Sequence, residues 1–181
     1  MNNNHQIKFI VLLFAMSLLF TTPLVAKESM TKFKINWPIG WNVSEKKKEN
    51  RNLKTSYIVL ALKTLNNKPE AFLTIHEMPR NDGEKANLEY EFEVMIKTIT
   101  KLARKNKSNL EIIKKEAFKF KSHPAFKAAM TMEINGSKIT QEITMALTNK
   151  YMYAITSAHL NEIKTENSKA IEKALDTLEL F

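Results

Sequence analysis

The side chains that could do chemistry are few and widely spaced. Three histidines lie beyond the N-terminal region, His76, His123 and His159, and their separation matches no local metal-binding motif. We interpret them as unrelated polar positions on strands and a turn, and we therefore predict no metal site. A deep pocket in which the three histidines converged would overturn this reading.

Carboxylates and a serine are the remaining candidates for catalysis. Glu77, Glu133 and Glu142 fall in or near predicted strands, and two of them facing one cleft would suit glycoside hydrolysis. Ser137 follows Gly136 at the tip of a predicted hairpin, without the Gly-x-Ser-x-Gly elbow of serine hydrolases. We therefore predict that the protein is not an enzyme, with a small hydrolase that uses strand carboxylates as the alternative.

Residue types that the chain lacks narrow the function further. The sequence has no cysteine, which removes thiol nucleophiles, disulfides and zinc sites with cysteine ligands. Its three glycines lie far apart and cannot form the Gly-rich loop that cradles a nucleotide phosphate. We accordingly predict no cofactor.

The N-terminal region has the layout of a secretory signal. Residues 1–8 are polar with one lysine, residues 9–20 are apolar apart from Ser17, and residues 21–26 end in Ala26. As a helix, the apolar run would be about 18 Å long, whereas a bilayer core is about 30 Å thick. We predict cleavage after Ala26, export to the periplasm or beyond, and a single domain over residues 27–181; an uncleaved anchor is the alternative.

Hydrophobic periodicity predicts the elements of that domain. Alternation predicts strands, and apolar residues every three or four positions predict a long helix from Glu84, capped by Asn81 or Asp82, and a closing helix from about Thr165. A corner made by Trp37, Pro38, Ile39, Gly40 and Trp41 interrupts the first strand, and residues 45–56 are predicted to be an exposed loop. The predicted strands are 33–37, a piece beginning with Trp41 and Val43, 57–65, 71–78, 110–121, 125–134, 138–148 and 151–159.

This order of segments resembles the PsbP-like superfamily, which includes Mog-type nuclear-transport factors and many small exported bacterial proteins. The resemblance rests on the Pro38-Ile39-Gly40-Trp41 corner, the paired strands, the long helix, the Ser122-His123-Pro124-Ala125-Phe126 entry to a meander and the terminal helix. It implies an α+β fold, with an antiparallel sheet flanked by helices in an α/β/α sandwich. It also implies a role in binding or assembly.

Positive charge is concentrated in one part of the chain. The formal net charge is +9, and residues 97–121 hold nine Lys or Arg residues against two Glu, a surplus of +7. We predict a contact surface for another envelope protein or an anionic membrane surface, and we exclude nucleic acid because the protein is exported. The alternative, which we favour from the residues alone, is a solvated rim without a partner. The candidate residues are Lys97, Lys101, Arg104, Lys105, Lys107, Lys114, Lys115, Lys119 and Lys121.

The leading functional hypothesis is an exported, non-enzymatic binding or assembly-accessory protein of the PsbP-like type. An envelope inhibitor or immunity protein that blocks a toxin or hydrolase is the alternative. Four methionines in the predicted meander, Met130, Met132, Met145 and Met152, could line a promiscuous apolar groove, although we favour an ordinary core position for them.

Overall fold

A computed structural model describes residues 31–49, 55–66, 68–80, 87–106, 108–134, 136–161 and 164–181. The predicted signal segment and its cleavage position at Ala26 lie outside the described residues.

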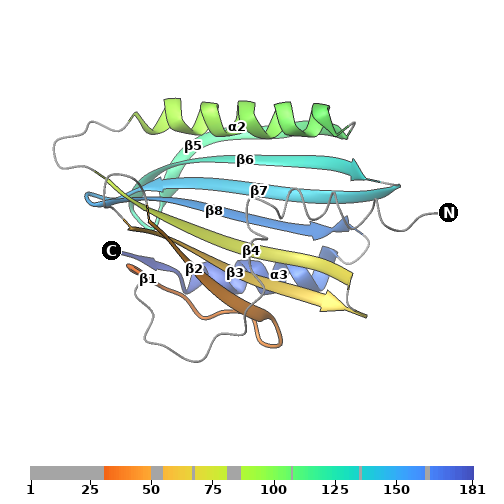
Figure 1. Cartoon of the computed structure of the whole chain (residues 1–181), viewed down its shortest axis with the longest axis horizontal. Coiled ribbons are helices and arrows are strands. Elements are labelled where there is room, and N and C mark those ends of the chain that lie inside the picture. The colour runs from red at the N-terminus through yellow and green to blue at the C-terminus, as the bar shows by residue number, and fades with distance from the viewer. Residues whose placement is uncertain are drawn as a thin grey trace.

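The described residues form a seven-stranded antiparallel sheet in the order β2-β3-β4-β8-β7-β6-β5, together with a two-stranded sheet of β1 and β9 (Figure 1). The strand bounds are β1 Phe33–Lys34, β2 Asn42–Glu49, β3 Thr55–Leu65, β4 Lys68–Pro79, β5 Asn109–Phe120, β6 His123–Ile134, β7 Ser137–Leu147, β8 Tyr151–Leu160 and β9 Glu179–Leu180.

The strands from β5 to β8 follow the sequence pattern closely. They form a meander in which each strand pairs with the next, as the alternation of apolar and milder residues predicts. Gly136, in the turn between β6 and β7, has a φ of 82°, a conformation that glycine adopts without a steric penalty. The preceding turn places Lys121 and Ser122 at positive φ, 50° and 71°, so the chain reverses before His123 rather than across it.

The two helices begin and end near the predicted positions. Helix α2 spans Leu88–Lys105, and its cap is Asn87, whose side-chain oxygen accepts a hydrogen bond from the Tyr90 amide at 3.1 Å. The predicted cap positions 81 and 82 lie outside the described residues. Helix α3 spans Lys164–Asp176.

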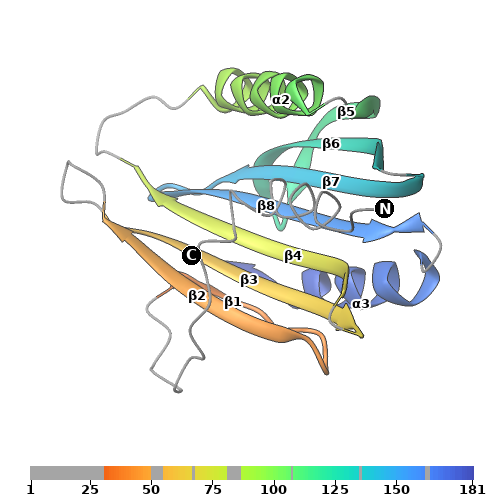
Figure 2. The ribbon, with the colours of Figure 1, turned by 45° about the vertical axis from the view of Figure 1, so that its right-hand side comes forward.

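Alternation along the strands assigns the helices to opposite faces of the large sheet. On β4 and β8, Leu73, Ile75, Tyr153 and Ile155 pack in one cluster with the α3 residues. The intervening residues face α2, which packs on β5, β6 and β7 (Figure 1 and Figure 2). The architecture is therefore a mostly antiparallel sheet with two helices, and each helix covers only part of its face.

Two predictions about the N-terminal half are wrong. The predicted loop over residues 45–56 is strand at 45–49 in β2 and at 55–56 in β3, while residues 50–54 lie outside the described part. The charged sequence misled the prediction because β2 is an edge strand, where charged side chains are common. Within the predicted strand 33–37, only Phe33–Lys34 forms a strand, β1. This strand pairs with β9 and not with the large sheet.

The Trp37-to-Trp41 corner lies beside the α3 face. The Trp41 amide donates to the Pro38 carbonyl at 3.3 Å, and Gly40 has a φ of 78°, so the chain turns here before it enters β2. Both tryptophans are half-buried and pack against the cluster that contains the α3 residues.

Candidate binding groove under helix α2

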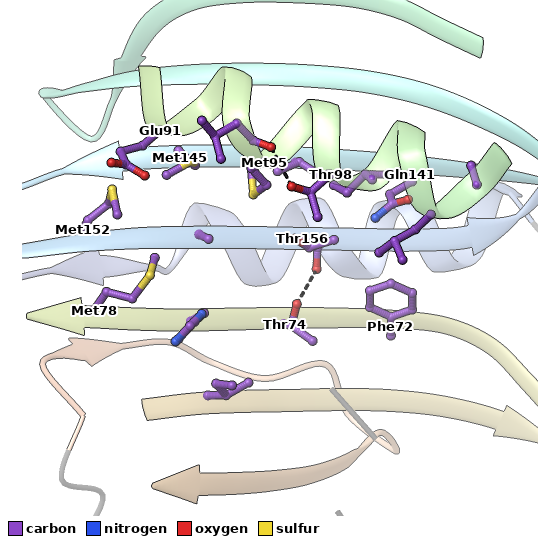
Figure 3. Close-up of a pocket in the computed structure, with 18 of the residues that line it drawn as sticks. Phe72, Thr74, Met78, Glu91, Met95, Thr98, Gln141, Met145, Met152 and Thr156 are labelled. Atoms are coloured by element: carbon purple, nitrogen blue, oxygen red, sulfur yellow. Dashed lines mark hydrogen bonds between the residues drawn. The ribbon is translucent and has the colours of Figure 1, made fainter. Parts of the chain in front are cut away.

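A groove lies on the α2 face, between α2 and the uncovered part of the sheet. Its cavity volume is about 350 Å³, within the range of about 300–1,000 Å³ that is usual for small-molecule sites. Side chains from α2, β3, β4, β6, β7 and β8 line it (Figure 3). The groove exists because α2 packs over β5, β6 and β7 and leaves β4 and β8 uncovered on this face.

Strand register determines the floor of the groove. Met78 lies opposite Met152, and two positions further along the strands His76 lies opposite Ala154. The next row pairs Thr74 with Thr156. The last row joins Phe72, Ala158 and Gln141 across β4, β8 and β7. Since these residues are two apart on each strand, they all point to the α2 side.

Helix α2 supplies the opposite wall. Phe92 and Ile96 are buried against the sheet, whereas Met95, Ile99 and Leu102 lie on the adjacent side of the helix and line the groove. From Glu91 to Asn106, the groove-lining part of the chain covers 15 helical steps, or about 22 Å. The strand segment from Phe72 to Met78 covers about 20 Å. The two lengths agree, so the groove is elongated along the helix.

Most polar groups in the groove already have partners within the protein. The Thr98 hydroxyl donates to the Val94 carbonyl at 2.8 Å, and the Thr74 hydroxyl donates to the Thr156 carbonyl at 3.3 Å. The Asn106 side-chain Nδ2 donates to the Leu102 carbonyl at 2.8 Å. These bonds leave the groove predominantly apolar.

Gln141 differs from these three residues. Its side chain lines the groove, the residue is only 4% exposed, and its Oε1 atom has no hydrogen-bond partner among the described residues. Buried polar atoms are nearly always hydrogen-bonded, so this acceptor beside the cavity is available to a donor from outside the chain, either a water molecule or a ligand group.

Three of the four methionines confirm the expectation of a core position. Met130, Met132 and Met145 are buried and Met152 is half-buried, and Met132, Met145 and Met152 also line the groove. Met78 and Met95, on β4 and α2, join them there. The thioether side chain is flexible and polarizable, so the groove can adapt to the shape of an apolar ligand.

The three histidines are not brought together. His76 lines the groove, His123 begins β6, and His159 is buried with Nδ1 3.3 Å from the Leu160 carbonyl oxygen. His159 lies opposite Ala71, five positions along β4 from His76, and faces the other side of the sheet. Within the described residues, no group of three His, Asp or Glu side chains is arranged to hold a metal ion.

The predicted strand carboxylates do not form a pair either. Glu142 is in an ion pair with Lys127, with 3.0 Å between Oε2 and Nζ, and Glu133 is exposed. Glu77 lies in the row of Ala146, four positions along β7 from Glu142. All three therefore share the α3 face but lie apart on it.

Glu77 is instead buried near the β1–β9 pair. It accepts a hydrogen bond from the Lys32 backbone amide at 2.5 Å. Burial raises the pKa of its carboxyl, the Lys32 hydrogen bond lowers that pKa, and the charge of Glu45 raises it further. Sequence reasoning did not single out Glu45, because it placed that residue in a loop.

Tyr153 is the neighbour of Glu77 on β8 and is fully buried. Its hydroxyl lies 2.8 Å from the Lys32 carbonyl oxygen and 3.2 Å from the Phe181 carbonyl oxygen. Burial raises the pKa of this hydroxyl, and the charge of Glu77 adds to the rise. Neither Glu77 nor Tyr153 lines the groove. Their hydrogen bonds to Lys32 and Phe181 instead hold the two ends of the described chain together.

The predicted basic residues that the structure describes are distributed over α2, β5 and the turn after β5. Lys97, Lys101, Arg104 and Lys105 are exposed on α2, mostly on the side away from the sheet. On β5, a register shift between Ile112 and Lys114 precedes the lysines. Lys107 lies outside the described residues.

Three of the β5 and turn lysines have partners. Lys115 reaches Glu93 of α2 at 2.5 Å, Lys114 pairs with Glu116 at 2.6 Å, and Lys121 donates to the Asp176 carbonyl at 2.7 Å. Lys114 and Lys119 lie on opposite faces of β5, which separates them. The four α2 cations are therefore the part of the predicted surface that gathers on one element.

Neither helix in the described part of the chain has both the length and the apolar content needed to cross a bilayer.

Comparison with known proteins identifies the fold. No protein-family model matches the sequence, and no curated protein matches it. The solution structure of a cyanobacterial PsbP from Synechocystis is similar with a TM-score of 0.54 and 8% identity, over 88% of this chain and 100% of that one. The chain therefore has a PsbP-like fold.

Two further solved structures are similar. A crystal structure from Bacteroides thetaiotaomicron has a TM-score of 0.51 and 13% identity over 83% of this chain, which spans only 45% of that protein. LpqN of Mycobacterium tuberculosis, described as involved in cell envelope biogenesis, has a TM-score of 0.44 and 9% identity, over 82% of each chain. At these identities the likeness concerns the fold alone.

Proposed function

We propose that this chain is an exported, non-enzymatic binding protein whose ligand site is the groove under α2. The observation that carries the proposal is the elongated apolar cavity of about 350 Å³, with the unpartnered Gln141 acceptor in its wall. An apolar cavity with few polar groups is the usual form of a small-molecule site. We also propose that the sheet and its two helices form the α/β/α sandwich that the resemblance to PsbP-like proteins implies.

The chemistry of the groove supports binding rather than catalysis. Among the described residues that line it, Glu91 is the one carboxylate and His76 the one imidazole, and the other polar lining groups are threonine hydroxyls and amides. Catalysis by acid and base needs positioned groups that reach one substrate atom. The methionines, Ile99 and Leu102 instead provide apolar contact along the groove.

The N-terminal sequence supports export. Its polar start, apolar run and small residue at position 26 are typical of a signal peptide. Expression of the full chain in a bacterium with a periplasm, followed by N-terminal sequencing of the periplasmic fraction, should give a mature protein that begins at Lys27. Recovery of the uncleaved chain in the membrane fraction would instead support an anchor.

The outer side of α2 is the proposed contact surface. Its exposed cations lie next to the groove on the same helix, so a partner with negative charge would meet the protein beside the ligand site. The partner class that we propose is another component of the envelope.

A substitution that fills the groove tests the binding site. Ala154 lies in the floor of the groove on β8, and a phenylalanine there would extend into the cavity. We expect Ala154→Phe to reduce binding of the uncharged fluorescent probe N-phenyl-1-naphthylamine by at least tenfold. Val43→Phe adds a ring at an exposed β2 position outside the groove and should leave probe binding unchanged.

Folding of both variants is checked by circular dichroism and thermal melting. If Ala154→Phe folds and still binds the probe like the unsubstituted protein, or if the unsubstituted protein does not bind the probe, the groove is not the ligand site. If Ala154→Phe does not fold, Ala154→Leu gives the same test with a smaller side chain.

A further inference from the structure

We propose that the groove holds the unbranched aliphatic chain of a single-chain amphiphile, with a hydroxyl or amide N–H of that molecule donating a hydrogen bond to Gln141 Oε1. This inference rests on the proposed function and names the ligand class for the same site. It follows from the shape of the groove, from the position of Gln141 and from the distribution of charge along α2.

The shape fits one chain. The groove is about 20 Å long from its Phe72 end to its Met78 end. One leaflet of a bilayer core, which is the length of one lipid chain, is about 15 Å thick. An apolar cavity of about 150 Å³ takes up benzene, and this cavity is roughly twice as large and drawn out along the helix. A flexible linear molecule therefore fits it better than a compact ring.

The two ends of the groove differ in chemistry. Met78, Met145 and Met152 lie together at one end, near Glu91 (Figure 3). Gln141 and Phe72 lie at the other end (Figure 3). The methionine end offers polarizable apolar contact for the tail of a chain. The Gln141 end offers the hydrogen-bond acceptor, so the polar group of the ligand belongs there.

Charge on α2 supports the same orientation. Glu91 and Thr98 line the groove, and Lys105 follows at the same seven-residue spacing, so it lies on the same side of the helix at the Gln141 end. Asn106, which lines the groove, is the next residue. A polar or negatively charged head group is therefore favoured at the Gln141 end, and the acidic Glu91 disfavours a negatively charged head at the other end.

Two matched ligands test the hydrogen bond. Dodecan-1-ol and 1-methoxyundecane contain the same number of non-hydrogen atoms and one oxygen each, but only the alcohol can donate a hydrogen bond. Each is used to displace N-phenyl-1-naphthylamine from the full-length mature protein. We expect the alcohol to displace the probe at a concentration about five- to tenfold lower than the ether, because only the alcohol satisfies Gln141 Oε1.

Substitution of Gln141 tests the partner in the protein. Gln141→Met keeps an unbranched side chain of similar length without the acceptor, and it should bring the two ligands to equal potency. Thr100→Val is the matched control, because the Thr100 hydroxyl already donates to the Ile96 carbonyl within α2 and the residue does not line the groove. This control should keep the preference for the alcohol. If Gln141→Met does not fold, Gln141→Asn, whose amide is withdrawn from the cavity, should show the same loss of preference.

The outcomes separate the two proposals. Equal potency of alcohol and ether in the unsubstituted protein would overturn the hydrogen bond to Gln141. Probe binding that is sensitive to Ala154→Phe but is displaced by neither chain would overturn the ligand class and leave the groove as a site. Absence of probe binding would overturn the proposed function itself.

Discussion

Phe92→Leu should weaken the attachment of α2 to the sheet. Phe92 is 1% exposed, and its ring stacks on Phe126 with 5.5 Å between centroids and 29° between planes. An aromatic pair of this kind contributes about 0.5–1.5 kcal/mol beyond its buried area. Truncation of a core Phe to Ala costs about 3–5 kcal/mol, and leucine retains much of that volume. We therefore expect a loss of about 1–3 kcal/mol in the free energy of unfolding.

Urea denaturation followed by circular dichroism measures this loss. Tyr90→Leu removes an aromatic ring from the same helix at a position that is 63% exposed, and it should change the free energy of unfolding by less than about 0.5 kcal/mol. Hydrogen exchange should show faster exchange in α2 than in α3 for Phe92→Leu. Equal stability of the Phe92 and Tyr90 variants would refute the argument that Phe92 attaches α2 to the sheet.

Glu77→Gln should change the dependence of stability on pH. Burial raises the pKa of Glu77 above 4.5 in the folded protein, so ionisation of this carboxyl costs stability. Relative to Glu77→Gln, the unsubstituted protein should therefore lose free energy of unfolding as pH rises above about 4.5. A difference between the two proteins that stays constant from pH 4 to pH 8 in urea titrations would contradict this. Tyr153→Phe should lower the free energy of unfolding by about 1 kcal/mol in the same assay, the lower end of the range of about 1–3 kcal/mol for a buried polar group that loses its partner. The loss is small because both carbonyls keep another donor: the Phe181 amide donates to the Lys32 carbonyl at 3.2 Å, and the Thr148 hydroxyl donates to the Phe181 carbonyl at 3.3 Å. A loss above about 3 kcal/mol would mean that these donors do not compensate. Charge reversal on α2 should abolish sedimentation with vesicles of phosphatidylglycerol and phosphatidylcholine at low salt, because each basic residue near an anionic surface contributes about 1 kcal/mol to membrane binding. If the unsubstituted protein does not sediment with these vesicles, the partner of this surface is a protein. The reversed residues in that variant are Lys97, Lys101 and Arg104, which are exposed on the outer side of α2.

The sequence was sufficient to predict most of the sheet because its pattern is local. The alternation around the Asn135-Gly136 pair predicts β6, β7 and their pairing, and the structure confirms both strands. The long helix is likewise confirmed over Leu88–Lys105. The edge strand β2 was missed, because Glu45, Lys46 and Lys47 have the composition of a loop and only their pairing with β3 identifies them as strand.

The groove could not be predicted in the same way. The apolar stripe on α2 includes Phe92 and Ile96, which meet the sheet, and also Met95, Ile99 and Leu102, which face the cavity. Periodicity shows that a helix has an apolar side, but it does not show how far the helix covers the sheet beneath it. The opposite wall comes from β4 and β8, about 80 residues apart in the chain. The width of the α2 stripe was the one local signal of a second apolar contact.

The hydrogen bonds from Tyr153 to Lys32 and Phe181 have a consequence for engineering. Because the Phe181 amide bonds to the Lys32 carbonyl and β1 pairs with β9, residues 32 and 181 lie side by side on the α3 face. A short peptide could therefore join them, and new ends could be opened at the turn between β3 and β4, which gives a circularly permuted chain. In the unpermuted chain, a reporter domain fused after Phe181 would project from the face opposite the groove, so the cavity would stay accessible.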